Sequence, residues 1–274
     1  MTVAAKRKKN GNAGTAEPIL LRRDSAEGVT TLTLNRPDAR NALSTGLIGE
    51  IQSTLDAIAT DASVKVVVVA AKGSAFCAGH DLKELRANPG RQHYETLMAQ
   101  CSKMMLSFNR LPQPVIAKVH AAAWAAGCQL VATCDLAVAA KSANFCTPGV
   151  NIGLFCATPM VALTRNVGRK QAMEMLLLGE AIDADTAVTY GLVNRAVDDD
   201  RLDAAVDEIA ATIVGKSPLT LKIGKEAFYR QIELDIASAY DFASDAMVQN
   251  MMARDAEEGI DAFIEKRDPV WTGR

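Results

Sequence analysis

The stretch from Val115 to Asp135 limits the possible folds of this chain more than any other. It begins with the β-branched run Val115–Val119, which is typical of a buried strand. Very small residues fill most of positions 121 to 127, and a helical apolar pattern begins near Ala126. Small side chains at such a turn let a ligand approach backbone N–H groups, and a helix N-terminus adds positive potential. The stretch therefore indicates either an anion-stabilising turn or tight packing of an alanine-rich helix against a sheet.

A similar order of elements precedes this stretch. Lys65–Ala70 is a continuous apolar run, as expected for a strand covered on both faces, and the small-residue turn Phe76–Leu82 follows it. Residues 18–23 and 29–34 predict a β-hairpin, Ser44 predicts the N-cap of a helix, and residues 136–140 predict a further strand. The recurring order of strand, small-residue turn and helix indicates the α/β class, although no sequence repeat is detectable.

Toward the C-terminus the pattern becomes almost purely helical. Gly179 and Gly191 end two amphipathic helices, and residues 202–214, 218–228 and 232–252 carry helical patterns. We therefore divide the chain into a tail of residues 1–16, an α/β core of residues 17–200 and a helical region of residues 201–274. The basic tail lacks the apolar segment of a secretory signal. A solvated, disordered tail is favoured over a transit fragment or a nucleic-acid-binding arm.

Composition excludes several classes of protein. The formal net charge of -2 argues against a nucleic-acid-binding surface. No apolar run approaches the roughly 20 residues that span a bilayer, so no membrane contact is expected. The six cysteines show no metal-ligand spacing, which indicates free thiols in a reducing compartment. We expect the cytoplasm if the protein is bacterial and the mitochondrial matrix if it is eukaryotic.

Motifs of several common catalytic classes are absent from the sequence. It contains neither the glycine spacing of a nucleotide-binding loop nor a serine nucleophile elbow nor a paired-histidine zinc motif. The three histidines are too dispersed for a metal site, so we expect no bound metal and no cofactor. A couple of Cys77 with His80 is conceivable, but no third group is in place to orient it.

Two small-residue turns remain as candidates for chemistry. They lie at Ala78-Gly79 and at Ala126-Gly127, and each is preceded by a predicted strand and followed by a predicted helix. Two backbone N–H groups that converge from such turns can polarise a single carbonyl oxygen, which is the geometry of an oxyanion hole.

An ordered set of short motifs extends from about residue 18 to the C-terminus. The motifs are Asn35-Arg-Pro-(x3)-Asn41-Ala-Leu, Phe76-Cys-Ala-Gly-x-Asp81-Leu, Pro114-Val-Ile-Ala, Cys134-Asp-Leu-Ala-Val-Ala, Gly179-Glu-x-Ile-x-Ala, Gly191-Leu-Val-Asn and Gly259-Ile-x-Ala-Phe-x-Glu-Lys-Arg. Together they resemble the enoyl-CoA hydratase/isomerase (crotonase) family. The run Ala125-Ala-Gly-Cys-Gln-Leu and the ending Pro-Val-Trp271 are similar to one subgroup, whose members are named for the fold more than for a proven reaction.

The resemblance implies a spiral of ββα repeats followed by a C-terminal helical region that mediates trimers or dimers of trimers. It implies binding of an acyl-CoA thioester as substrate or ligand, with no other cofactor. By position, the N–H groups of Ala78 and Ala126 would hold the thioester oxyanion.

The same resemblance implies the residues that line the ligand. Ala78, Gly79, His80 and Asp81 would line the thioester and pantetheine end, and the loop at Ala39 and Arg40 would lie near the CoA nucleotide. Phe263 and Lys266 of a neighbouring subunit would help to bind CoA. The alternatives are core packing for Phe263 and solvated surface charges for Arg40 and Lys266.

Two departures from the family pattern bear on catalysis. Hydratases of the family use two glutamates, whose positions here hold Gln129 and Gly149. A glutamine has no usable pKa for acid–base work, and losing such a group costs about 10²–10⁴-fold in rate. Between Glu95 and Glu174 the only acidic residue is Asp135, whose family counterpart is structural.

Three functions therefore remain under consideration. The first is an enoyl-CoA hydratase or isomerase that adds water to, or rearranges, an acyl-CoA with an unusual base, drawn from His80, Asp81, Cys146 and Cys156. The second is a non-catalytic acyl-CoA-binding or regulatory trimer. The third, a serine or cysteine hydrolase on the same scaffold, has the least support. For the candidate bases, an exposed loop position for His80, a helix cap for Asp81 and core packing for the cysteines are the structural alternatives.

Overall fold

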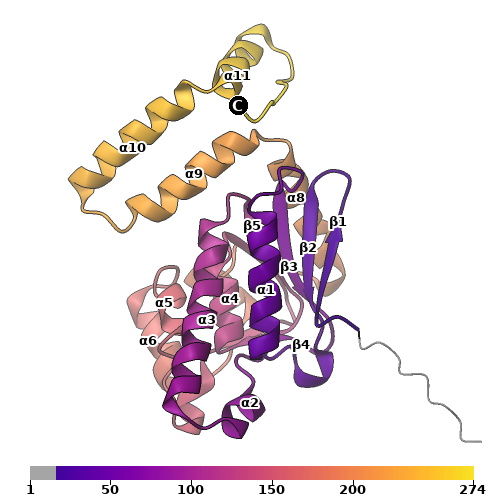
Figure 1. Cartoon of the computed structure of the whole chain (residues 1–274), viewed down its shortest axis with the longest axis vertical. Coiled ribbons are helices and arrows are strands. Elements are labelled where there is room, and N and C mark those ends of the chain that lie inside the picture. Colours follow the sequence, from indigo (N-terminus) through magenta and orange to yellow (C-terminus); the bar gives the residue numbers. More distant parts are fainter. Residues whose placement is uncertain (1–16) are drawn as a thin grey trace, which may run out of the picture.

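The computed structural model describes residues 17–274, so the expectation of a disordered tail lies outside the described residues. A six-stranded sheet in the order β1-β2-β3-β5-β7-β10 forms the centre of the molecule (Figure 1). Only β1 is antiparallel to its neighbour, β2, and the other strands pair in parallel. The strands are β1 (Leu20–Asp24), β2 (Val29–Leu34), β3 (Val66–Ala71), β5 (Val115–Val119), β7 (Leu136–Ala140) and β10 (Arg195–Val197).

Helices cover both faces of this sheet. On one face lie α1 (Thr45–Ile58) and α3 (Arg91–Arg110), and on the other lies α8 (Leu202–Val214). Alternate side chains of β3 pack on opposite faces of the sheet. Val67 and Val69 belong to the larger core, and Val66 and Val68 pack with α8. The prediction that this continuous apolar run forms a strand covered on both faces is thereby confirmed.

A second, four-stranded sheet completes the core. Its strands are β4 (Ala75–Cys77), β6 (Ala122–Trp124), β8 (Asn144–Cys146) and β9 (Ile182–Asp183). Each of the pairs β3–β4, β5–β6 and β7–β8 is followed by a helix or 3-10 turn, so the chain repeats a ββα unit. The remaining core helices are η1 (Pro37–Ala39), α2 (Leu82–Ala87), α4 (Ala126–Thr133), η2 (Pro148–Ile152), α5 (Pro159–Leu163), α6 (Arg169–Leu178), α7 (Ala184–Tyr190) and η3 (Asp199–Arg201).

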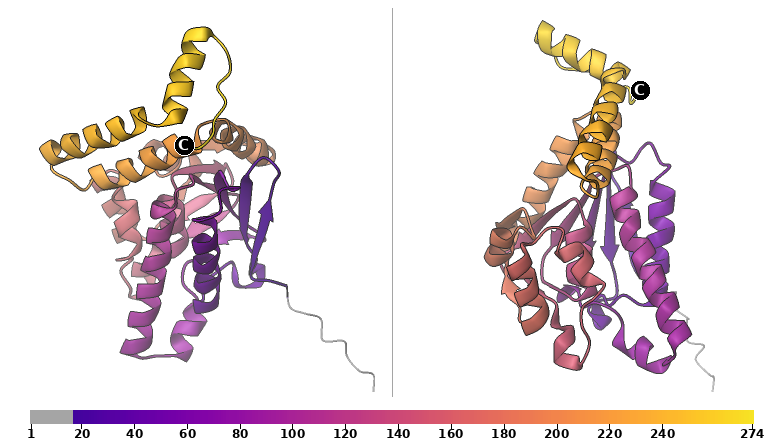
Figure 2. Two further views of the ribbon diagram at one scale, coloured as in Figure 1. Left: turned by 45° about the horizontal axis from the view of Figure 1, so that its top comes forward. Right: turned by 90° about the vertical axis from the view of Figure 1, so that its left-hand side faces the viewer.

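The last three helices project from the core. Helices α9 (Pro218–Gln231), α10 (Ile236–Met251) and α11 (Arg254–Glu265) stand at the end of the sheet away from β4 and α2 (Figures 1 and 2). The helical region that we expected from residue 201 therefore includes α8, which packs on the sheet through Leu202, Val206 and Ala210. The projecting part begins only at Ser217, whose hydroxyl caps α9 by accepting from Thr220 N at 3.2 Å.

A buried ion pair attaches α9 to the core. Lys225 Nζ donates to Asp135 Oδ2 at 2.7 Å and to the carbonyl oxygens of Phe108 and Gln113 at 2.9 Å each. The Tyr229 hydroxyl donates to Asp135 Oδ1 at 2.8 Å. Asp135 is thus structural, as its family position implied.

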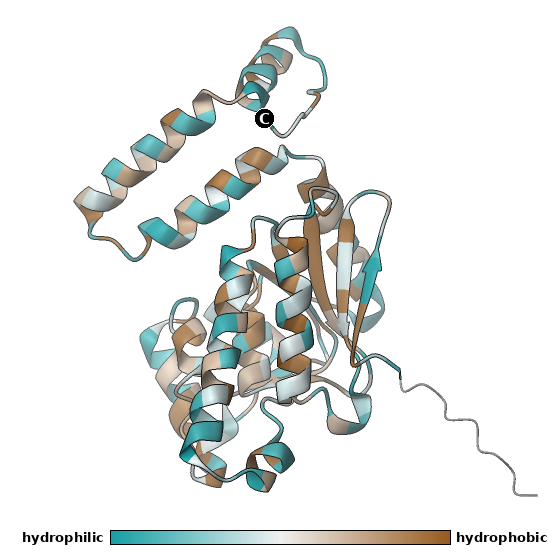
Figure 3. Cartoon of the chain, in the orientation of Figure 1, coloured by the Kyte–Doolittle hydropathy of each residue, from teal (hydrophilic) through white to brown (hydrophobic). Residues whose placement is uncertain are grey.

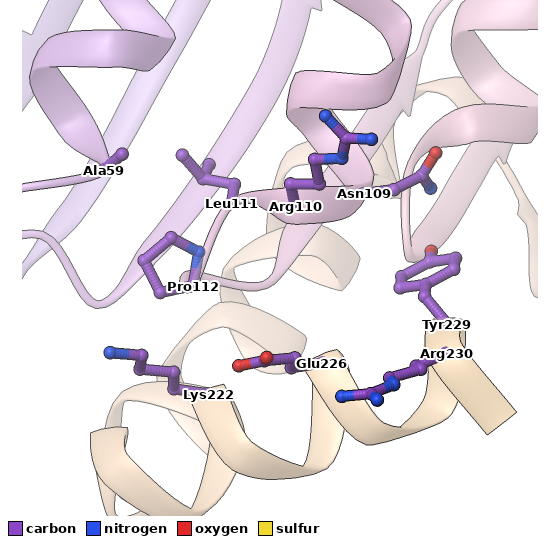
Figure 4. Close-up of a pocket in the computed structure, with 9 residues that line it drawn as sticks. All are labelled: Ala59, Asn109, Arg110, Leu111, Pro112, Lys222, Glu226, Tyr229 and Arg230. Atoms are coloured by element: carbon purple, nitrogen blue, oxygen red, sulfur yellow. The ribbon is translucent and has the colours of Figure 1, made fainter.

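Next to this ion pair, a cavity of about 710 Å³ separates α9 from the loop before β5 (Figure 4). Its walls include Asn109, Arg110 and Pro112 from the core and Lys222, Glu226 and Arg230 from α9.

The projecting helices carry hydrophobic residues along their length (Figure 3), and many of these side chains are exposed in the single chain. Those with at least half of their area exposed are Phe228, Ile232, Ile236, Tyr240, Met247, Val248, Met251, Met252, Ile260, Phe263 and Ile264. Patches of this extent mark interaction surfaces in soluble proteins.

Candidate functional site

The two small-residue turns meet through their backbones. Gly79 has φ +94, and a Cβ there would lie 2.8 Å from the Ala125 Cβ and 3.3 Å from Ala126 N. A Cβ on Gly127 would lie 2.1 Å from the Cys77 carbonyl oxygen, because α4 packs directly on β4. Side chains at either glycine would force the turns apart.

The hydrogen bonds of residues 78–81 show which N–H group is free. Ala78 donates to Arg40 O at 3.0 Å and Asp81 donates to Leu43 O at 3.1 Å. The N–H of His80, between these two residues, has no hydrogen-bond acceptor within residues 17–274. This corrects the expected donor, since the Ala78 N–H is already engaged.

On the second turn, the N–H of Ala126 also has no acceptor within the described part of the chain. Ala126 is the first residue of α4, and no side chain caps this helix. The free N–H groups of His80 and Ala126 therefore belong to turns in direct contact, at a helix N-terminus that favours negative charge.

Ala125 holds a strained conformation at this point. Its φ of 50° and ψ of -117° lie in a region that residues with a side chain rarely adopt. Its N–H donates to Cys146 O at 2.8 Å, which ties the turn to β8. No residue type at this position indicates the strain, because alanine is rarely found in such a conformation.

A cavity of about 230 Å³ opens beside the turns. Its lining is formed by Arg40, Ser74, Ala75, Ala78, Ala122 and Trp124. Arg40 and Ala78 thus line the same cavity, and Ala39 ends η1 just before Arg40.

Trp124 was not expected in this lining. Its Nε1 donates to Asn144 Oδ1 at 2.6 Å, which holds the ring in place on β6. Its position in an alanine-rich run and its partial exposure are the signals that can identify it from sequence and structure.

The two positions of the family glutamates differ in how they are filled. Gln129 lies in the second turn of α4 with 5% of its area exposed, and its Oε1 has no hydrogen-bond partner among the described residues. Gly149 lies in η2, where a Cβ would be 2.7 Å from Leu154 O and 2.9 Å from Cys156 Sγ. The loop packs tightly against Gly149, so a glutamate does not fit there without movement of the backbone.

The carboxylate of Asp81 caps a helix and forms an ion pair. Its Oδ1 caps α2 by accepting from Lys83 N at 3.1 Å and Glu84 N at 3.3 Å, and its Oδ2 pairs with Arg36 at 2.9 Å. Burial opposes ionisation, but the Arg36 guanidinium and the cap hydrogen bonds outweigh it and lower the pKa of Asp81. The helix-cap interpretation is confirmed, and the carboxylate is poorly placed to act as a base.

The cysteines near the second turn are buried thiols. Burial raises the pKa of Cys146 to about 11 and also raises that of Cys156. The Cys146 thiol donates to Gly179 O at 3.2 Å. Both side chains are therefore protonated at neutral pH and serve packing, and all six cysteines are free.

Phe263 and Lys266 are not brought to this site within one chain. Phe263 is 85% exposed on α11, so the core-packing interpretation is wrong, and Lys266 ends the same helix with φ 58°. Both lie on the projecting helices, at the end of the molecule away from β4 (Figure 1).

Two further properties concern the described residues as a whole. No helix among them is long and apolar enough to cross a membrane. No group of three or more His, Cys, Asp or Glu side chains within residues 17–274 is arranged to hold a metal ion.

Comparison with known proteins defines the class of this molecule. Residues 24–274 match the model of the enoyl-CoA hydratase/isomerase family, and the chain belongs to that family. A crystal structure of an enoyl-CoA hydratase from Mycobacterium smegmatis is 55% identical and superposes with a TM-score of 0.92, covering 93% of this chain and 99% of that one. The expected crotonase-type α/β fold is thereby confirmed.

The expected similarity to one subgroup is also confirmed. The human enoyl-CoA hydratase domain-containing protein 3, which is named as mitochondrial, is 45% identical over 246 residues, or 90% of this chain and 81% of the human protein. The crystal structure of that human protein superposes with a TM-score of 0.90, at 43% identity over 93% of this chain and 100% of that one.

Proposed function

We propose that this protein binds an acyl-CoA thioester and polarises its carbonyl oxygen with the N–H groups of His80 and Ala126, as an enzyme of the enoyl-CoA hydratase type. The observation that carries the proposal is the pair of unengaged N–H groups on two turns in direct contact. Donors fixed in advance stabilise the negative charge that develops on a thioester oxygen, whether the next step is hydration or isomerisation.

The cavity beside the turns suits the arm of coenzyme A. Alanines make it narrow and apolar, the Trp124 ring forms one side, and the exposed Arg40 offers a positive charge to a phosphate. These residues support an entry route in which the thioester end reaches the turns and the nucleotide stays near Arg40. Gly79, His80 and Asp81 follow Ala78 on the same turn.

The projecting helices support assembly into trimers. Their exposed apolar side chains need a covering surface, and a second copy of the chain supplies one of matching chemistry. In such an assembly α11 of one subunit reaches the site of another, which gives Phe263 and Lys266 their proposed role against CoA. Sedimentation velocity at several protomer concentrations tests this, and a monomer at all of them contradicts it.

A second candidate function is binding without turnover. It is favoured by the absence of a carboxylate at Gln129 and by the packing of Leu154 O and Cys156 Sγ around Gly149. Such a protein keeps the polarising donors but releases its ligand unchanged.

Gly79→Ala tests the polarising donors. The added Cβ meets the Ala125 Cβ at 2.8 Å and separates the turns, so the two N–H groups no longer converge. A chromophoric dienoyl-CoA reports polarisation as a red shift of its absorption band. We expect the shift with the unchanged protein and its loss with Gly79→Ala.

Gly49→Ala on α1 is the matched control, since nothing lies within 4 Å of its added Cβ. No red shift with the unchanged protein contradicts the proposed function. Hydration of crotonyl-CoA, followed by loss of the conjugated thioester, then separates the two candidates: turnover supports the enzyme, and tight binding with none supports the binding protein.

A further inference from the structure

The cavity between α9 and the loop before β5 is separate from the two turns. Its volume of about 710 Å³ falls within the range of sites that bind small molecules, roughly 300–1,000 Å³. Pro112 of its wall precedes β5, whereas Ala122 of the smaller cavity follows that strand. The two cavities therefore lie at opposite ends of β5, and the larger one is not part of the proposed acyl-CoA site.

The charges that line this cavity are mostly positive. Three of them are the cations of Arg110, Lys222 and Arg230, and the fourth is the carboxylate of Glu226. All four side chains are exposed, and none forms a salt bridge within residues 17–274. Since the whole chain has a formal net charge of -2, this positive balance is local. A recess lined by unneutralised cations attracts anions.

The cations stand on two facing walls. Lys222 and Arg230 lie two turns apart on α9, and Arg110 ends α3 on the opposite side (Figure 4). The Cζ atom of Arg230 lies 4.2 Å from the centroid of the Phe242 ring, which holds the guanidinium against α10 and leaves its N–H groups available. A ligand that meets both walls must therefore carry more than one anionic group.

Apolar surface lies between these walls. Leu111 is buried beneath the loop, and Ala59 and Pro112 line the cavity beside it. The Tyr229 hydroxyl already donates to Asp135, so this residue presents its ring more than its polar end. Such a surface suits a flat organic ring better than a bare hydrated ion.

We propose that this cavity binds a small organic polyphosphate of the nucleoside diphosphate class. The phosphates lie between Arg110 on one wall and Lys222 and Arg230 on the other, and the base lies over Leu111 and Pro112. Inorganic pyrophosphate shares the phosphate chemistry but lacks the ring. The site does not depend on the proposed acyl-CoA function, because no residue is common to the two cavities.

A ligand held by both walls also links α9 to the core. The existing link is the buried pair of Lys225 with Asp135, which lies next to the cavity. Binding only to the attached state of α9 stabilises that state by mass action. Saturating ADP should therefore slow the release of α9–α11 in limited proteolysis, and an unchanged rate overturns the proposed bridging.

Equilibrium dialysis with ADP, and separately with pyrophosphate, tests the site at an ionic strength of about 0.15 M, where surface charges are screened. We expect one ADP per chain. Arg110→Met and Lys222→Met should each raise the Kd by about tenfold, the effect of losing one charge-assisted hydrogen bond. Glu226→Gln should lower the Kd by about two- to fivefold, since it removes an exposed like charge. A folding defect does not produce such a gain.

Lys170→Met on α6 is the matched control, because it removes an exposed cation that has no place in the lining. Its Kd should equal that of the unchanged protein, and a tenfold rise there shows general charge attraction and overturns the proposal. Absence of ADP binding, or an unchanged Kd in Arg110→Met and Lys222→Met, also overturns it. A lower Kd for ADP than for pyrophosphate supports the nucleotide, whereas equal values overturn the role of the apolar surface.

Dialysis of ADP in the presence of saturating dienoyl-CoA separates this site from the proposed acyl-CoA site. We expect ADP to bind unchanged and the red shift of dienoyl-CoA to persist. Displacement of ADP by dienoyl-CoA overturns the separate site and leaves the proposed function intact. A missing red shift together with normal ADP binding counts against the proposed function alone.

Discussion

Replacement of Lys225 by methionine is the sharpest test of how the projecting helices are attached. The side chain is 7% exposed, and its Nζ makes three hydrogen bonds of 2.7 to 2.9 Å, one of them to the Asp135 carboxylate. Methionine preserves the length of the chain but removes the charge and all three bonds. Asp135, whose side chain is 16% exposed, is then left without its counter-ion.

The expected loss of stability depends on the hydrogen bonds that the Asp135 carboxylate keeps. Removing one partner of a buried ion pair costs roughly 3–5 kcal/mol, because the other charge stays buried. Here Asp135 keeps two donors, Val115 N at 2.7 Å and the Tyr229 hydroxyl at 2.8 Å. These donors compensate in part, so we expect Lys225→Met to lower the free energy of unfolding by about 3 kcal/mol.

Urea unfolding at one fixed protomer concentration measures this change, since assembly also contributes to stability. Lys222→Met, one turn earlier on α9, is the control, because this exposed side chain makes no hydrogen bond or ion pair within the described residues; it changes the free energy by less than about 0.5 kcal/mol. Limited proteolysis of Lys225→Met should release α9–α11 before the core. A loss below about 1 kcal/mol refutes the view that this ion pair fixes α9 to the sheet.

Three further predictions concern single positions. Ala125→Gly relieves the conformation at φ 50° and stabilises the protein by about 1 kcal/mol in urea unfolding, after the entropy of glycine is subtracted. Gly149→Glu lowers the melting temperature and restores no hydration, because its Cβ meets Leu154 O at 2.7 Å; unchanged melting contradicts this. Burial alone raises the pKa of Asp255, but hydrogen bonds from Ser217, Thr272 and Gly273 outweigh it and lower the pKa to about 2. Because the folded pKa lies below the unfolded value of about 4, this stabilisation is present at neutral pH and is lost as the pH falls from about 4 toward 2. Trp fluorescence measures that acid transition, which should be weaker in Asp255→Asn.

The sequence predicts the long elements of this fold closely. The apolar positions of α1 are the five residues that the structure buries, and Ser44 caps the helix by accepting from Leu47 N at 3.2 Å. Strands β2, β5 and β7 have the expected bounds. Periodicity over many residues, or a continuous β-branched run, is a strong local signal that the tertiary structure rarely overrides.

The short strands could not be predicted in the same way. Strands β6, β8, β9 and β10 have only two or three residues each, and β6 is made largely of alanine. Their pairing depends on neighbours that are far away in the sequence, such as Ala75 of β4 opposite Ala122 of β6. A cluster of tiny residues therefore predicts a turn when the chain is in fact still extended.

The N–H of Ala78, which the resemblance implied as a donor, bonds to Arg40 O, whereas the N–H of His80 on the same turn is free. The sequence spacing alone does not decide whether Ala78 or His80 supplies the free N–H, since both flank Gly79. The direction of each N–H depends on the backbone angles, and the left-handed φ of Gly79 leaves the His80 N–H free while that of Ala78 bonds to Arg40 O. The free N–H group can be identified only when the acceptor of each backbone N–H in the turn is known.

The replacement of the second glutamate is more than a change of one side chain. Leu154 O and Cys156 Sγ occupy the space of a side chain at Gly149, so the loop has adapted to its absence. Hydration by the two-carboxylate route needs groups that act on water at the β carbon, and this loop offers none at Gly149.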